Sequence, residues 1–409
     1  MITKKSMTGL MAALLLAWFM NASVSASNNQ SPRIDTIESK TPSRRRLVYE
    51  DTDLKKRKKQ KATVDYEGVL MWDHDHYTGA HIDHTHKHYL LGNETELRRA
   101  SLTFKSEIDN DWAAELEICL SDDDEGPEAD DAFITFTGWD TAALIIGQTK
   151  EPFGLEELTS SKYTTTIERS MATAAFAPGA HPGIGVSAER QQFTWAIGIY
   201  EVADRKEKRD TYAVTGRLTF APWVKKQRVM HLGVSGSLRN LDGEKHKIKE
   251  NAEVHTAEEI VISPEIPADR LILSAFEACW IWGPFSFQTE YMRASVKAPD
   301  DLVAFYGGYY AQGSYFVTGE IRPYKKGGFK EIEPQSSLGA LEMVCRYSAL
   351  DVRDRGRGDA AINVTLGMNY YSNKHVRIMI NYIHTTLKGD IPENEKKAKA
   401  ISYRLQYSF

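Results

Sequence analysis

The sequence predicts an all-β protein, a 16-stranded antiparallel transmembrane β-barrel with an in-folded third extracellular loop. Apolar and polar residues alternate with a period of two in many segments after residue 62, which is the pattern of β-strands. Beyond residue 26 there is no run of about 20 apolar residues, as a membrane-spanning helix would need. If such a chain spans a membrane it must close into a barrel, because only helices and closed barrels satisfy the backbone in lipid.

The last ten residues, Ala400 to Phe409, show the alternation most clearly. One face is apolar and aromatic: Ile401, Tyr403, Leu405, Tyr407 and Phe409. The other face is small or polar and carries Arg404. This division fits a strand between lipid and water, although a half-buried strand of a soluble sheet also alternates. An aromatic final strand that ends in Phe resembles the assembly signal of bacterial outer-membrane proteins.

Residues 1–26 have the features of a signal peptide. Lys4 and Lys5 precede an apolar stretch from Met7 to Met20, and small residues around Ala26 suit cleavage. A membrane anchor is the alternative, but the stretch is short for a span. Residues 27–61 are polar and basic without apolar periodicity, so we expect a disordered periplasmic segment before a barrel of residues 62–409.

Composition excludes several classes of function. The formal charge of −5 argues against a nucleic-acid partner. The three cysteines, Cys119, Cys279 and Cys345, are far apart and predict neither a disulfide framework nor a zinc site. We expect no cofactor. The mean hydropathy of −0.44 does not argue against a barrel, whose lumen-facing residues are polar.

Strand-like segments recur along residues 62–409. We expect strands to begin near Ala62, Thr95, Asp111, Asp130, Thr141, Gly183, Phe193, Tyr212, Val229, Leu271, Phe285, Leu302, Ala340, Ala360, His375 and Ala400. The number is even, as in bacterial barrels, and short and long connections alternate, as expected of periplasmic turns and extracellular loops. The segment from Lys325 to Leu338 is long where a short turn belongs, so it is either a long turn or a miscounted hairpin.

The alternation places charged residues inside the barrel. The predicted lumen cations are Arg99, Lys105, Arg217, Arg239, Arg322, Arg346, Arg377 and Arg404. The predicted lumen acids are Glu115, Glu117, Glu277, Glu290, Glu320 and Glu342. Guanidinium groups suit the oxygens of phosphate and carboxylate, whereas the glutamates weaken anion selectivity. Alternatively, these charges only pair with one another and solvate the wall.

The connection from Thr149 to Pro182 is long and carries apolar residues such as Leu155, Leu158 and Phe176. Apolar residues need a surface to pack on, and the inside of the barrel wall is the nearest one. We therefore expect this third loop to enter the barrel and narrow it, opposite Arg99, Arg377 and Arg404. An ordinary extracellular loop is the alternative.

Two stretches resemble the phosphate-selective porin O and P family. They are IGQTKEPFGLEELTSSKYTTTIERS, from Ile146 to Ser170, and YYAQGSYFVTGEIRPYKKGGFKEIEP, from Tyr309 to Pro334. The resemblance runs from about residue 62 to Phe409. It implies a 16-stranded porin, usually trimeric, with its third loop inside the barrel. Lys150, Lys162 and Arg169 would then lie on the constriction loop.

A histidine-rich stretch from Asp73 to His88 is not part of the resemblance. His84, His86 and His88 share a face in an extended chain and could bind Zn²⁺, Ni²⁺ or Cu²⁺. A solvated loop without metal is the alternative. We expect this stretch in the first extracellular loop.

These observations favour an outer-membrane channel for small hydrophilic solutes with a mild preference for anions such as phosphate, formed by a homotrimer in outer-membrane lipid. A closed structural barrel or an adhesin is the alternative. A barrel-type enzyme is disfavoured, because no G-x-S-x-G motif occurs and half of the histidines lie in one stretch.

Overall fold

The computed structural model describes residues 63–82, 87–120, 127–202, 211–225, 227–388 and 396–409; for residues 80–91 it describes only the backbone. The expected signal peptide and basic segment lie outside the described residues. Within the described part, no helix is long and apolar enough to cross a membrane.

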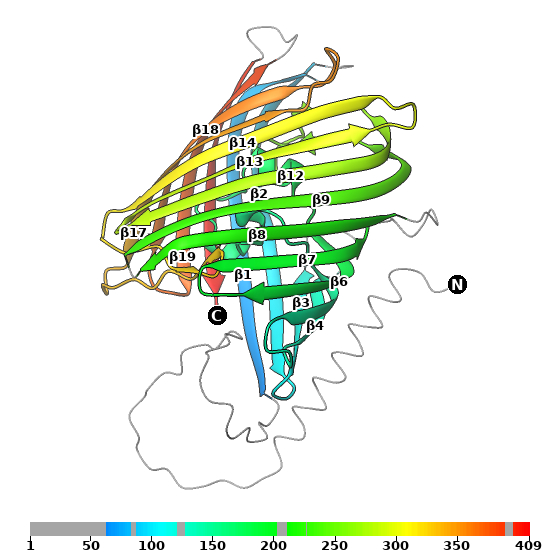
Figure 1. Ribbon diagram of the computed structural model, residues 1–409. Coiled ribbons are helices and arrows are strands. Elements are labelled where there is room, and N and C mark those ends of the chain that lie inside the picture. The colour runs from blue at the N-terminus through cyan, green and yellow to red at the C-terminus, as the bar shows by residue number, and fades with distance from the viewer. Residues whose placement is uncertain (1–62, 83–86, 121–126, 203–210, 226, 389–395) are drawn as a thin grey trace, which may run out of the picture.

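Sixteen antiparallel strands form one closed barrel (Figure 1). The strands are β1 Thr63–Ile82, β2 Lys87–Glu107, β3 Trp112–Leu120, β4 Glu128–Phe136, β5 Ala143–Lys150, β6 Ala180–Glu189, β7 Phe193–Glu201, β8 Tyr212–Lys225, β9 Arg228–His246, β12 Ile266–Trp282, β13 Phe285–Lys297, β14 Val303–Phe316, β17 Ala340–Asp351, β18 Ala360–Tyr371, β19 Val376–Lys388 and β20 Lys397–Ser408. The fold class predicted from the alternation is confirmed.

Pairing between β1 and β20 closes the barrel, with Trp72 opposite Leu405. Gly68 and Phe409 extend this ladder, because each backbone N–H donates to the other residue's carbonyl. A β-carbon at Gly68 would lie 2.3 Å from the Phe409 ring, so the ring could not keep this position over any other residue.

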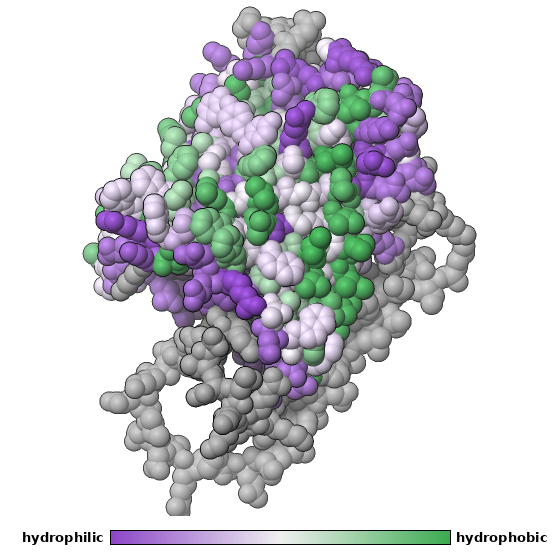
Figure 2. Space-filling model, in the orientation of Figure 1, coloured by the Kyte–Doolittle hydropathy of each residue, from purple (hydrophilic) through white to green (hydrophobic). Residues whose placement is uncertain are grey.

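The two faces of the wall differ as predicted. Leu405 and Tyr407 are exposed on the outside, whereas Arg404 and Gln406 are buried on the inside. Figure 2 shows hydrophobic residues across the middle of one outer face, with hydrophilic residues toward its margins. This is the outer surface that a barrel presents to lipid.

The two ends of the barrel also differ. One end, called the turn end here, has connections as short as residues 283–284 and carries Phe409; the opposite loop end has long connections, such as residues 151–179. Short turns face the periplasm in bacterial barrels, so the loop end is extracellular.

Two expected boundaries were wrong. The second strand, expected to begin near Thr95, begins at Lys87, and β1 continues to Ile82, so most of the histidine-rich stretch expected in the first loop is strand. Likewise, the strand expected to begin near Leu271 is β12, which begins at Ile266 and pairs with a β9 that runs to His246. Polar residues near the loop end obscured the period of two, because strands there extend beyond the apolar band.

Three connections pack inside the barrel. The third loop carries α2 Leu155–Leu158, a 3₁₀ turn η1 Ser161–Tyr163 and α3 Met171–Phe176. The β9–β12 connection carries the small hairpin β10 Lys249–Glu250 and β11 Val261–Ile262. At the turn end, the β14–β17 connection carries β15 Tyr324–Lys325 and β16 Gly328–Phe329. The long segment after Lys325 is therefore part of one long turn and not a miscounted wall hairpin.

Candidate channel and its constriction

The third loop is attached to the inner wall through Glu290 on β13. The backbone N–H groups of Leu155 and Glu156 donate to its carboxylate at 2.8 and 2.7 Å, and the Tyr310 hydroxyl donates at 2.6 Å. Gly154, with φ of 72°, passes so close that a β-carbon would lie 2.9 Å from Glu290 Oε2. The carboxylate thus satisfies the N–H groups at the start of α2.

Arg346 on β17 joins two inward connections. Its Nη2 donates to Glu253 of the β9–β12 connection at 2.6 Å. Its Nη1 donates to the Thr166 hydroxyl at 2.5 Å and to the Glu168 carbonyl at 3.0 Å, both on the third loop. The side chain is 1% exposed, so it acts as a buried connector and not as a water-facing cation.

Arg377 and Arg404 lie underneath the third loop. Arg404 forms ion pairs with Asp73 and with Glu168 and donates to the Ile167 carbonyl at 2.6 Å. Arg377 donates to the Thr164 carbonyl at 2.8 Å and lies 4.8 Å from the centre of the Tyr371 ring. Arg404 is 3% exposed and Arg377 is 2% exposed. The expected open gap between them and the loop is therefore absent, because both guanidinium groups are hydrogen-bonded to the backbone of the loop.

Three other arginines that were predicted to line the lumen are also paired. Arg239 bonds to Glu151 at 2.9 Å, Arg217 pairs with Glu277, and Arg322 pairs with Glu342. Arg322 and Glu320 were predicted on a strand, but β14 ends at Phe316 and both lie on the inward turn that follows.

That turn narrows the turn end of the barrel. The Tyr324 hydroxyl lies 2.7 Å from His231 Nδ1, and Arg217 donates to the Gly327 carbonyl at 3.1 Å. Phe329 packs with Leu155, Cys279 and Ile281 in a buried cluster. The sequence did not reveal this packing, since its partners are more than 40 residues apart in the chain.

Partly exposed charges gather in another part of the interior. Six cations have side chains between 16% and 32% exposed: Arg98, Arg99, Lys105, Lys150, Lys162 and Arg169. The first three lie on β2, and the others lie at the end of β5 and on the third loop. Water therefore reaches the space between the third loop and the wall formed by β1 to β5.

Ion pairs cross this space. Lys162 of the loop and Lys105 of β2 both contact Glu67 of β1, at 2.9 and 3.0 Å. Lys150 and Arg169 both contact Glu157, at 2.7 and 3.3 Å. The Lys162–Glu67 contact joins the loop to the facing wall and marks a constriction.

Arg98 was not among the predicted lumen residues. The register of β1 and β2 shifts between Met71 and Asp73, and Arg98 on β2 lies at this bulge. Its Nε donates to Glu168 at 3.0 Å. A bulge changes which residues face inward, and nothing in the alternation signals it. Glu67 and Asp73 could have been found, because they share the inward parity of Val69 and Met71.

The cations around the third loop lower the pKa of its carboxylates, including Glu168. Burial alone would raise its pKa, but Arg98 and Arg404 outweigh burial and hold the pKa of Glu168 well below its usual range. Glu157 behaves similarly, because Arg169 and Lys150 lower its pKa despite burial. Both loop carboxylates are therefore ionised at neutral pH and neutralise the cations beside them.

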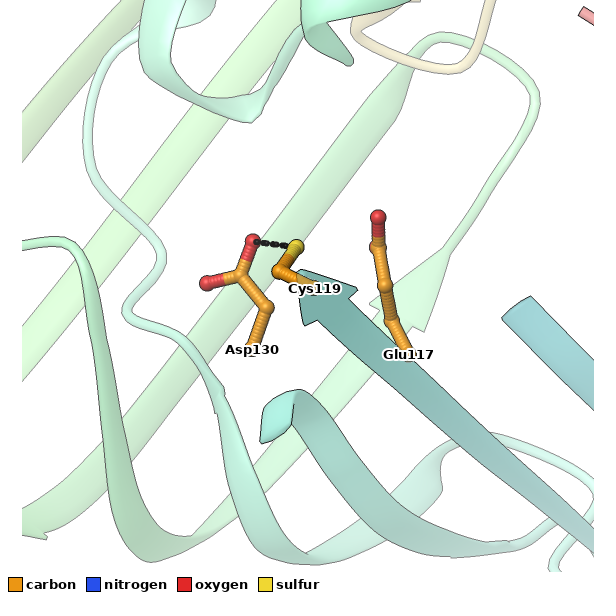
Figure 3. A group of neighbouring side chains, drawn as sticks. All are labelled: Glu117, Cys119 and Asp130. Carbon is orange, nitrogen blue, oxygen red and sulfur yellow. Dashed lines mark hydrogen bonds between the residues drawn. The ribbon is translucent and has the colours of Figure 1, made fainter. Parts of the chain in front are cut away.

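Cys119, Glu117 and Asp130 form a group on β3 and β4 (Figure 3). Their ligand atoms lie within 4.8 Å of one another. Arg99 Nη1 lies 3.2 Å from Asp130 and 3.8 Å from both Cys119 and Glu117. Because this guanidinium already supplies the positive charge, we assign the group to an ion pair and not to a metal.

The predicted metal site at His84, His86 and His88 stays a prediction, because the structure describes none of these three side chains. His84 and His86 lie outside the described residues. His88 lies on β2, with His81 opposite it in the backbone register.

The closed barrel, its inward loop and its charged interior define the class of porins. The family model for phosphate-selective porin O and P matches residues 76–409, so the chain belongs to this family. Porin O of Pseudomonas aeruginosa is 27% identical over 401 residues, which cover 85% of this chain and 90% of that protein. An uncharacterised protein of Caulobacter vibrioides is 27% identical over 332 residues, covering 74% of this chain and 65% of that protein.

Solved porins share the fold. An anion-selective porin from Comamonas acidovorans has a TM-score of 0.56 at 12% identity, with 85% of this chain and all (100%) of that chain covered. OmpF of Salmonella typhi, in complex with daunomycin, has a TM-score of 0.53 at 12% identity, with 85% and 97% covered. The chain is thus a porin of the bacterial outer membrane.

Proposed function

We propose that small hydrophilic solutes pass between the third loop and the wall of β1 to β5, with a mild preference for anions. The observation that carries this proposal is the set of six partly exposed cations that line this space. Each is also paired with a carboxylate, so the preference is weak. The names of the family and of the Comamonas acidovorans porin support an anionic solute, and phosphate is the first to test.

We further propose that the chain works as a homotrimer and as a channel without enzymatic activity. A trimer form is named for the outer-membrane protein OmpT of Vibrio cholerae, which has a TM-score of 0.52 at 12% identity. Chemical cross-linking of the folded protein tests the trimer. A structural barrel or adhesin would instead show no conductance in planar bilayers.

The three cysteines allow the path to be tested directly. Cys119 lies in the proposed path, Cys279 is buried, and Cys345 is exposed on the outer face. An anionic methanethiosulfonate should react with Cys119 and lower the single-channel conductance, because it adds volume and negative charge to the lumen. The Cys119→Ser variant should conduct normally and resist the reagent. If the reagent lowers its conductance equally, the path does not pass Cys119.

Reversal potentials in a salt gradient test the anion preference. We expect a small potential of the anion-selective sign that declines as the salt concentration rises, because salt screens the lumen charges. A cation-selective sign would refute the preference while leaving the pore intact.

A further inference from the structure

Arg293 lies on the outer face of the wall, where lipid is expected. It is exposed on β13, while its neighbours Met292 and Ala294 are fully buried on the inside. An arginine on the lipid face is costly near the bilayer centre and is tolerated near the interface. Its height on the wall therefore decides what it can contact.

A group of tyrosines fixes that height. Tyr291 is the outward residue just before Arg293 and stands opposite Tyr309, whose ring stacks on Tyr347 at 6.0 Å. All three are exposed. Aromatic girdles of this kind mark the boundary between the hydrocarbon and the headgroups. Arg293 is one outward step nearer the loop end, and its side chain extends over Phe305 in the next outward row, toward the headgroups of the outer leaflet.

The guanidinium of Arg293 has an aromatic neighbour but no anionic partner among the described residues. It lies 4.5 Å from the centre of the Phe305 ring. Its cross-strand neighbours, Ser274 and Gly307, are small. Stacking uses the face of a guanidinium and leaves its N–H edge available for an oxyanion.

Two more cations lie above Arg293 on the same outer face. Arg270 and Lys297 are both exposed, and they stand opposite each other on β12 and β13. Lys297 contacts the exposed Asp301 at 2.7 Å, a solvent-screened pair. The outer face at this height is therefore basic.

An apolar furrow lies directly below, toward the turn end. It has a volume of about 490 Å³, and its rim includes Leu218, Val234, Phe276 and Tyr291. Figure 2 shows the hydrophobic surface on the side that carries β8, β9, β12 and β13 in Figure 1. The furrow begins at Tyr291, two residues from Arg293, so one amphipathic molecule can fill the furrow and reach the arginine.

We propose that this face binds lipopolysaccharide, with a phosphate of its lipid A moiety on Arg293 and an acyl chain in the furrow. The phosphate supplies the missing anion, and a guanidinium binds phosphate through two parallel hydrogen bonds. Lipopolysaccharide forms the outer leaflet at the loop end, and a lipid with several phosphates suits the additional cations Arg270 and Lys297.

The test is lipid A binding to the folded protein, measured by native mass spectrometry in detergent. Arg293→Gln should weaken binding roughly ten-fold, as expected for the loss of one charge-assisted hydrogen-bonded contact. Arg228→Gln is the matched control, because Arg228 is also exposed and lies 5.0 Å from the Trp282 ring, but at the turn end. That variant should bind lipid A normally.

A second variant tests the furrow. Ala278→Trp fills it from β12 without changing charge and should also weaken lipid A binding. Single-channel conductance should be unchanged in all three variants, because none faces the lumen. Equal binding of phosphatidylglycerol would show that the site is not specific for lipopolysaccharide and would refute the assignment.

The remaining alternative is that a second copy of the chain covers this face. A cysteine introduced at Val234 would then form a disulfide or cross-link between subunits. That result, or unchanged lipid A binding by both Arg293→Gln and Ala278→Trp, would overturn the proposal.

Discussion

At the scale of single residues, pairing decides how much charge the channel presents. Glu67 holds Lys105 and Lys162 together, so two cations and one acid share one contact. In water-exposed surroundings such pairs add little stability, but they cancel the field that an anion would experience. The selectivity of this porin therefore depends on its acids as much as on its cations.

Replacing Glu67 with Gln tests this dependence. The change leaves Lys105 and Lys162 uncompensated, so the reversal potential should move toward anions. Glu265→Gln serves as the control, since Glu265 pairs with Lys245 at an exposed site near the loop end. An unchanged reversal potential for Glu67→Gln would show that ions do not pass this contact.

Glu250 of the inward hairpin links loop packing to pH. Burial, assisted by Glu253 and Glu259, raises its pKa to about 8. The unfolded group ionises near pH 4.5, so the folded protein binds more protons between these values. Stability from the neutral Glu250 is thus present at low pH and is lost as the pH rises toward about 8.

We expect the thermal midpoint of the protein to fall between pH 5 and pH 9, and Glu250→Gln to reduce that fall. The glutamine remains neutral throughout, which isolates this group from other ionisations. Calorimetry at both pH values measures the difference. An equal fall of the thermal midpoint in the two proteins would mean that Glu250 is not the group responsible.

At the scale of elements, buried ion pairs attach the inward connections to the wall. Arg346 bonds to the third loop and to Glu253 of the β9–β12 connection, whereas Glu290 caps α2. The Ser170 side chain also accepts from the Thr173 N–H and caps α3. The position of the constriction therefore depends on residues far from it in sequence.

Arg346→Gln should release both connections. Removing one partner of a buried ion pair costs about 3 to 5 kcal/mol, because the carboxylate left behind has no counter-charge. We expect a larger and noisier single-channel conductance. Arg353→Gln, which breaks an exposed pair with Asp351, should leave the conductance as it was. If Arg346→Gln has the conductance and the current noise of the unaltered protein, Arg346 does not hold the inward connections in place.

At the scale of the whole molecule, the first and last strands close the barrel. Phe409 covers Gly68 and contacts the rings of Tyr66 and Tyr407, at 6.4 and 5.8 Å. The contacts with Gly68 and Tyr66 join the two ends of the chain and form only when these ends meet, so they stabilise closure specifically.

Phe409→Ala should lower the fraction of chains that fold, measured as the heat-modifiable species on a denaturing gel. Trp139→Ala removes an exposed aromatic side chain at the turn end and should fold normally. Equal folding yields for the two variants would show that closure of the barrel does not depend on the Phe409 ring.

The sequence predicted the wall better than the interior. A period of two determines that Arg404 points to the inside of the barrel and Leu405 to the outside. The number of strands and the inward or outward direction of their residues were therefore predictable. It does not show which acid meets which arginine, because Arg346 and Glu253 are 93 residues apart. The bulge at Arg98 and the inward turn at Arg322 also depend on packing that no local pattern encodes.

The inward connections give this barrel something that a bare sheet lacks, a hydrophobic core. Phe153, Met171 and Phe176 pack with Val254 and Ile260 and with the inner wall. The wall strands are joined by a continuous ladder of backbone hydrogen bonds, whereas the inward connections are attached to the wall at a few points. The connections therefore have a lower local stability than the wall. On warming, the inward connections should therefore unfold before the barrel wall. The porin should then have a wide, unobstructed lumen at a temperature where its strands are still paired.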